Sequence, residues 1–83
     1  MEHFVVINDW SNELECDVTI LGVTHSLKEA KKFFNEVIGD EKSYAQEHGY
    51  EIYDDYETGF DAGKAGNYSR EHTRVYIQKV TTW

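Results

Sequence analysis

The residues of this chain best suited to bind a metal ion or to form a nucleophile–base pair are four histidines and one cysteine: His3, His25, His48, His72 and Cys16. Structural zinc sites usually take two ligands from one short segment, separated by about two to five residues. No two of these five side chains lie within four positions of each other. Their spacing predicts neither a metal site nor a catalytic pair, so we expect no cofactor and no enzymatic activity.

The glycine-rich segment 59–65 (GFDAGKA) has some features of a phosphate-binding loop. It is one residue shorter than the GxxxxGK[ST] motif, and Ala65 stands where a hydroxyl would hold magnesium. No helical pattern follows, so no helix N-terminus would meet a phosphate. We therefore do not expect nucleotide binding here.

Calcium is the other ion to consider, because carboxylates crowd one stretch: Asp54, Asp55, Glu57 and Asp61. An EF-hand loop has acids at alternate positions, a glycine at position six and a glutamate at position twelve. Neither 55–59 nor 9–17 follows that pattern. The sequence predicts no specific calcium site.

The charge of the chain is unevenly distributed. Among 83 residues, 16 acids face 8 lysines and arginines, which gives a formal net charge of −8. Residues 36–61 contain nine of the acids and one lysine, so the whole net charge arises there. Direct binding to nucleic acid is disfavoured, because phosphate contacts by basic residues supply much of that affinity.

Tyrosines accompany these acids. Tyrosine offers a large contact area with a polar tip, and carboxylates attract a basic partner. We therefore predict a surface that binds a positively charged protein, with these candidate residues: Glu47, Glu51, Tyr53, Asp54, Asp55, Tyr56, Glu57, Phe60 and Asp61. In the alternative, the acids only keep the chain soluble, and Tyr50 and Tyr56 pack beneath a helix with Ile52.

Strand patterns surround one helical pattern. Residues 3–10 and 15–23 are rich in β-branched and aromatic residues and flank a polar turn, which predicts a hairpin. Cys16, Val18 and Ile20 alternate with polar residues, so we expect them on a buried face. Residues 50–56 and 73–80 are the third and fourth predicted strands, joined by a long glycine-containing connection, 57–72.

The helix is expected over residues 26–48. Ser26 and Glu29 form a capping-box pattern, and apolar residues follow at helical spacing. Gly39 could interrupt the helix, but the apolar pattern resumes at Tyr44, which favours continuation. Gly49 is suited to end it in a left-handed conformation.

These elements predict a single α+β domain over residues 1–83. The expected fold is a two-layer sandwich of ββαββ order, in which one long helix covers a four-stranded, mainly antiparallel sheet. The strand order stays open. One cysteine permits no internal disulfide, and the apolar runs are too short to cross a membrane, so we expect a cytoplasmic protein.

Segments between residues 5 and 34 (VVINDWSNE, ILGVTHS and SLKEAKKFF) resemble small uncharacterised proteins of bacteria and their phages, in which a strand hairpin precedes an S-x-x-E-A capped helix. The resemblance covers about a third of the chain and carries no activity with it. It implies a bacterial or phage origin and a non-catalytic, accessory role.

The leading hypothesis is a small acidic interaction module that binds a basic, nucleic-acid-binding protein of host or phage as an inhibitor or accessory factor. One alternative is a ligand-binding or enzymatic domain that uses the connection 57–72, marked by a pocket containing His72, Tyr68 and a carboxylate. The other is a structural homodimer, formed through an open sheet edge or the face opposite the helix.

Overall fold

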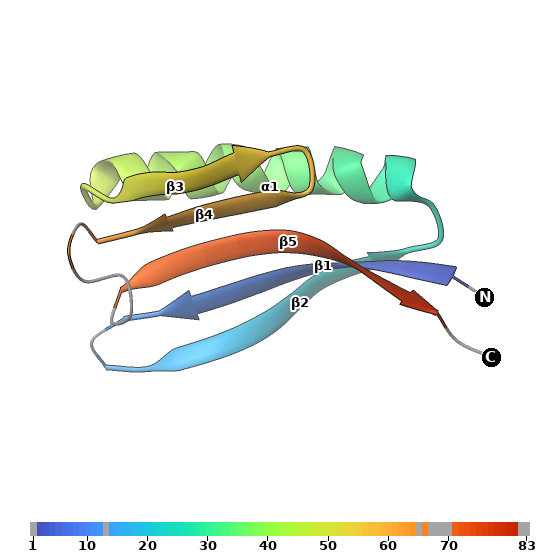
Figure 1. Ribbon diagram of the computed structural model, residues 1–83, viewed down its shortest axis with the longest axis horizontal. Helices are drawn as coiled ribbons and strands as arrows, with labels where there is room; N and C mark the ends of the chain where they lie inside the picture. Colours follow the sequence, from blue (N-terminus) through green and yellow to red (C-terminus); the bar gives the residue numbers. More distant parts are fainter. Residues whose placement is uncertain (1, 13, 65, 67–70, 82–83) are drawn as a thin grey trace.

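The computed structural model describes residues 2–12, 14–64, 66 and 71–81 of the protein. In this part of the chain one helix lies on one side of a five-stranded sheet (Figure 1). In chain order the elements are β1 (Glu2–Ser11), β2 (Cys16–Thr24), α1 (Leu27–Glu47), β3 (Glu51–Tyr56), β4 (Gly59–Gly63) and β5 (His72–Thr81).

The strands lie side by side in the order β2-β1-β5-β4-β3, and all neighbours are antiparallel. This confirms the α+β class, the antiparallel sheet and the single helix. The prediction of four strands in ββαββ order is wrong, because the described elements follow one another as ββαβββ. The additional strand, β4, lies inside the segment expected to be a long connection.

β4 has an unusual sequence for a strand, GFDAG, whose glycines and aspartate have low strand propensity. It is nevertheless paired on both sides, with β3 and with β5. Its side chains at Phe60 and Ala62 are buried in the core. Packing under the helix and pairing on two sides therefore stabilise a strand that local preference disfavours.

The predicted hairpin is confirmed by the antiparallel pairing of β1 with β2. Its turn depends on Asn12, whose side-chain oxygen accepts hydrogen bonds from the backbone N–H groups of Leu14 (2.8 Å) and Glu15 (2.9 Å). Such an Asx turn reverses the chain without a glycine.

The helix prediction is also confirmed. The Ser26 hydroxyl accepts a hydrogen bond from the Glu29 backbone N–H (3.1 Å) and caps the first turn. The helix continues through Gly39 without interruption and ends before Gly49, which has a φ of 68°. This left-handed conformation is the one that glycine adopts most readily.

One continuous core lies between the helix and the sheet. Val6, Phe60, Ala62 and Val75 come from the sheet, and the helix contributes residues one turn or two apart: Ala30, Phe34, Ile38 and Ala45. The helix approaches β2 closely, because a Cβ added at Gly22 would lie 3.1 Å from the Phe33 ring. Most of the apolar helix stripe predicted from sequence is therefore buried, although Tyr44 is 43% exposed.

The prediction that Cys16, Val18 and Ile20 are buried is wrong. Val18 and Ile20 are 58 and 64% exposed, and Cys16 is exposed as well. The register explains why, because Val6 pairs with Gly22 and the next residue, Ile7, pairs with Ile20. A β-bulge inserts one extra residue here, and the alternation of faces is reversed on either side of it. The three residues therefore face away from the helix.

Truncation of Phe60 tests the assignment of β4 to the core. Phe60→Ala should lower the free energy of unfolding by roughly 3–5 kcal/mol, because it removes a fully buried aromatic side chain. Leu14→Ala, at a side chain that is 94% exposed, should change it by less than about 0.5 kcal/mol. Urea denaturation of both variants measures the difference, and equal effects would place Phe60 outside the core.

Candidate functional site

The face of the sheet opposite α1, called the open face below, carries a group of exposed apolar side chains at one end. Val18, Ile20 and Val23 on β2 are 58, 64 and 58% exposed. Their partners Val5 and Ile7 on β1 are only partly buried. These five residues form the apolar half of the open face.

The other end of the open face is acidic and aromatic. Its residues, called the acidic half, belong to β3 and β4: Glu51, Tyr53, Asp54, Tyr56 and Asp61. Asp54 pairs with Asp61 and Tyr56 with Gly59 across the two strands, so their side chains share one face. The Tyr56 ring lies against Gly59, where a Cβ would overlap it. A hollow of about 290 Å³ adjoins these side chains, and Arg74 and Tyr76 also line it.

The remaining candidates from the sequence lie elsewhere. Glu47 is exposed at the last residue of α1. Asp55 and Glu57 form ion pairs with helix lysines, Asp55 with Lys42 (2.9 Å) and Glu57 with Lys31 (3.2 Å). These two acids are exposed, but they face the edge of the helix rather than the open face.

The prediction that Phe60 belongs to the binding surface is wrong. Its side chain is 1% exposed and belongs to the core beneath the helix. The residue was expected to lie beside Asp61 on one surface, but neighbours along a strand point to opposite faces. Phe60 is therefore not available to a partner.

The packing expected for Tyr56 and Ile52 is likewise wrong. Tyr56 is 59% exposed and Ile52 is 51% exposed, since both belong to the edge strand β3. Tyr50 does pack against the core. The acidic half therefore presents two exposed tyrosines, Tyr53 and Tyr56, among its carboxylates.

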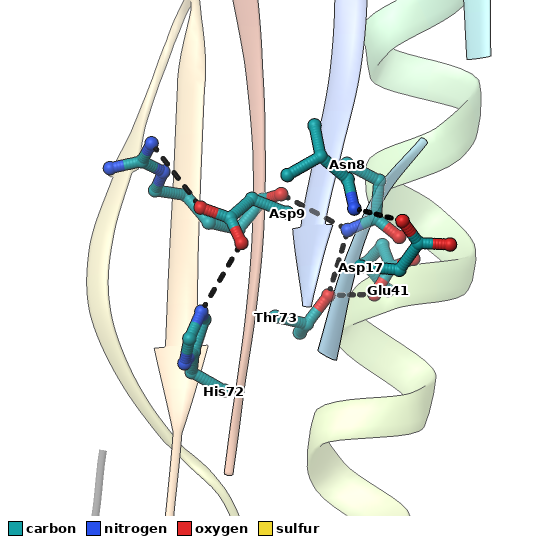
Figure 2. A network of polar contacts seen from close by, with 8 residues as sticks. Asn8, Asp9, Asp17, Glu41, His72 and Thr73 are labelled. Carbon is teal, nitrogen blue, oxygen red and sulfur yellow. Dashed lines mark hydrogen bonds and ion pairs between the residues drawn. The ribbon is translucent and has the colours of Figure 1, made fainter. Parts of the chain in front are cut away.

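An ion-pair cluster lies between the two halves of the open face. Asp9 is 3.6 Å from a ring nitrogen of His72 and 3.6 Å from the Arg74 guanidinium (Figure 2). Arg74 also lies over the Tyr76 ring, 4.6 Å from its centroid. Part of the positive charge of β5 is thus neutralised by Asp9, at the boundary of the apolar and acidic halves.

A second polar network lies on the helix side of the same strands. The Asn8 amide donates to the Thr73 hydroxyl (3.1 Å), which donates in turn to the Glu41 carboxylate (2.9 Å; Figure 2). Thr73 is 4% exposed. This chain of hydrogen bonds fixes the second half of α1 to the ends of β1 and β5.

Beside this network is a cavity of about 370 Å³ between α1 and the sheet. It is lined mainly by polar and aromatic residues: Asn8, Trp10, Ser11, Asn12, Asp40, Glu41, Tyr44, Tyr50, His72 and Thr73. His72 and carboxylates therefore do meet at a pocket, as the ligand-binding alternative requires. Tyr68, the third expected member, lies outside the described residues, as does Ala65 of the glycine-rich segment.

Two tyrosines have perturbed acidity, Tyr50 in the cavity lining and Tyr53 in the acidic half of the open face. Burial raises the pKa of Tyr50 to about 12, helped by hydrogen bonding with Tyr44 and by the Glu71 carboxylate. Desolvation, together with the Glu51 and Asp61 carboxylates, also raises the pKa of Tyr53. In both cases the surroundings favour the neutral phenol. Both groups therefore act as hydrogen-bonding neutral side chains at ordinary pH.

Within residues 2–12, 14–64, 66 and 71–81, no cluster of three or more His, Cys, Asp or Glu side chains has the proximity needed to hold a metal ion. In the same part of the chain, no helix combines the length and the apolar content needed to cross a bilayer.

Comparison with known proteins returned no match, whether to family models, to curated protein sequences or to solved structures. The resemblance to small bacterial and phage proteins therefore stays a prediction.

The titration of Tyr50 tests the geometry around the cavity. Its folded-state pKa of about 12 exceeds the ordinary 10.0, so the unfolded chain loses this proton first as the pH rises. The stability linked to the neutral phenol is complete below about pH 10 and is lost as the pH approaches about 12. In a Tyr53→Phe background, which removes the other tyrosine with a raised pKa, tyrosinate absorbance should show a step near pH 12 that Tyr50→Phe removes. Persistence of the step in that variant would contradict the assignment.

Proposed function

We propose that the protein is a binding module whose open face takes up a partner protein, and that the partner's surface combines basic residues with apolar ones. The observation that carries this proposal is that the apolar half and the acidic half lie on the same uncovered sheet face, at opposite ends of it. The role is one of binding rather than catalysis.

The apolar half supplies the first argument. Three β-branched side chains of one strand, Val18, Ile20 and Val23, each leave more than half of their surface in water. Isolated exposed apolar residues are ordinary, but a contiguous patch on a soluble domain is typical of an interaction surface. Covering such side chains contributes roughly 25 cal/mol per Å² of apolar area removed from water.

The acidic half supplies the second argument. Carboxylates beside exposed tyrosines favour a basic partner, because opposite charge accelerates the encounter and excludes partners of the wrong sign. Nucleic-acid-binding proteins carry such basic surfaces. An acidic module covering one would compete with phosphate, which supports an inhibitory or accessory role. A cytoplasmic location is part of the proposal, supported by the exposed thiol of Cys16.

Charge reversal on the open face tests the proposal. Glu51→Lys with Asp54→Lys should weaken capture of the partner from a bacterial lysate by about tenfold or more, because two attractive charges become repulsive. The matched control, Glu29→Lys with Glu36→Lys, makes the same change in net charge at exposed helix positions. Equal capture by the two double variants would show that position on the open face does not matter.

The apolar half is tested in the same assay. Val18→Ser with Ile20→Ser removes apolar contact area without changing the charge, and should also weaken capture. Leu14→Ser, at the exposed tip of the hairpin, is the control. A partner that binds the Val18/Ile20 variant as tightly as the wild type would restrict the interface to the acidic half.

A homodimer is the second candidate, favoured by the same exposed apolar side chains. A twofold axis parallel to the strands would lay β2 of one copy over β3 of the other, so that apolar side chains cover carboxylates. An axis across the strands would lay β3 over β3, so that carboxylates face carboxylates. An offset dimer that joins only the two apolar halves avoids both the burial of carboxylates under apolar side chains and the repulsion between facing carboxylates.

Mass in solution separates these candidates. We expect the monomer mass of 9.7 kDa across a dilution series, because a net charge of −8 repels a second copy. A concentration-dependent doubling of the mass, abolished by Ile20→Ser, would favour the offset homodimer over the proposed partner.

A further inference from the structure

The cavity between α1 and the sheet is separate from the open face, and its lining has a distinct chemistry. We propose that it binds an organic cation, an alkylammonium or alkylguanidinium group, which would lie among the aromatic rings with its charge near Glu41 and Asp40. The group belongs either to a small molecule or to a lysine or arginine side chain of a bound peptide.

Aromatic residues from three elements meet at this cavity. Trp10 comes from β1, Tyr44 from the second half of α1, and Tyr50 from the segment just before β3. The rings of Tyr44 and Tyr50 pack edge to face, with 5.8 Å between their centroids. This contact fixes the part of the cavity lining that the two tyrosines form. Faces of tryptophan and tyrosine attract organic cations, and several such rings around one space are the usual recognition site for an ammonium group.

The two carboxylates among the described lining residues make the cavity acidic. Asp40 and Glu41 both line it, and the only basic side chain among the lining residues that the structure describes, His72, lies 3.6 Å from Asp9. Glu41 forms no ion pair in the described part of the chain, where its hydrogen-bond donor is the neutral Thr73 hydroxyl. A carboxylate that is held in place but not neutralised favours a cation over an anion or a neutral ligand.

The Asn8–Thr73–Glu41 network gives the site its rigidity. Thr73 is nearly inaccessible to water, and its hydroxyl holds a Glu41 carboxylate oxygen 2.9 Å away. A binding group fixed before the ligand arrives loses little conformational entropy on binding. The volume of about 370 Å³ lies at the small end of the range for ligand pockets, which suits one side chain or one small amine.

Fluorescence of Trp10 tests the proposal directly. The chain contains two tryptophans, so the measurement uses a Trp83→Phe background in which Trp10 is the sole indole. Agmatine and an acetylated, amidated arginine tripeptide are titrated separately, with butylurea as an uncharged control. We expect saturable binding of a cation and none of butylurea. Tighter binding of agmatine indicates a free amine as the ligand, and tighter binding of the tripeptide indicates a side chain of a partner.

Two variants and a control assign the effect to this cavity. Glu41→Gln preserves the hydrogen bond from Thr73 and removes the charge, and should weaken cation binding about tenfold. In isothermal titration, Trp10→Leu should weaken it to a similar extent. Glu36→Gln, at an exposed position of the same helix outside the cavity lining, should leave binding unchanged.

Two outcomes would overturn the proposal. One is that neither agmatine nor the arginine tripeptide binds saturably. The other is that the Glu41→Gln variant binds the cation as tightly as the wild type does. The charge-reversed open-face variant, with Glu51→Lys and Asp54→Lys, should still bind the cation. The cation-binding proposal and the partner-binding proposal can therefore be contradicted independently of each other.

Discussion

A single helix can cover only one face of a sheet, and this limit determines which side chains of the protein are exposed to water. The 21-residue α1 buries Val6, Phe60, Ala62 and Val75 on one face, and nothing in the described part of the chain covers the other. Burial against the helix stabilises the core and even holds the weak strand β4 in the sheet. The side chains that point to the opposite face of the sheet are exposed or only partly buried. The alternation of side chains along each strand therefore decides which residues reach the open face.

That uncovered face is divided by strand order. The pairing places the first hairpin at one end of the sheet and the β3–β4 hairpin at the other, with β5 between them. Apolar residues of β1 and β2 therefore lie apart from the carboxylates and tyrosines of β3 and β4. Asp9 forms an ion pair with Arg74 at the boundary and lies 3.6 Å from a ring nitrogen of His72. Such a division favours a partner with two matching kinds of surface and disfavours stacking of two copies across the whole face.

Local signals in the sequence predicted the elements that depend on local chemistry. The Ser26 cap, the helix through Gly39, the stop at Gly49 and the first hairpin are confirmed.

The errors come from non-local packing. A bulge beside Leu21 reversed the expected faces of Cys16, Val18 and Ile20, and pairing on two sides made a strand of GFDAG. Phe60 was misplaced for the same reason. The acidic residues predicted on one surface separate into Glu51, Asp54 and Asp61 on the open face and Asp55 and Glu57 at the helix edge. A pocket containing His72 and a carboxylate was named as an alternative, but Trp10, Glu41 and Tyr50 were not predicted to line it, because they are far apart in the chain.

The central claim is that the open face, and not the helix, receives a partner. It is tested most directly by backbone amide chemical-shift mapping of the isotope-labelled protein as its captured partner is added. The account predicts that the largest shifts occur in β2, β1, β4 and β3, at residues around Ile20, Ile7, Asp61 and Asp54. Shifts confined to the exposed side of α1, around Lys28, Lys32 and Glu36, with the open face unchanged, would contradict it.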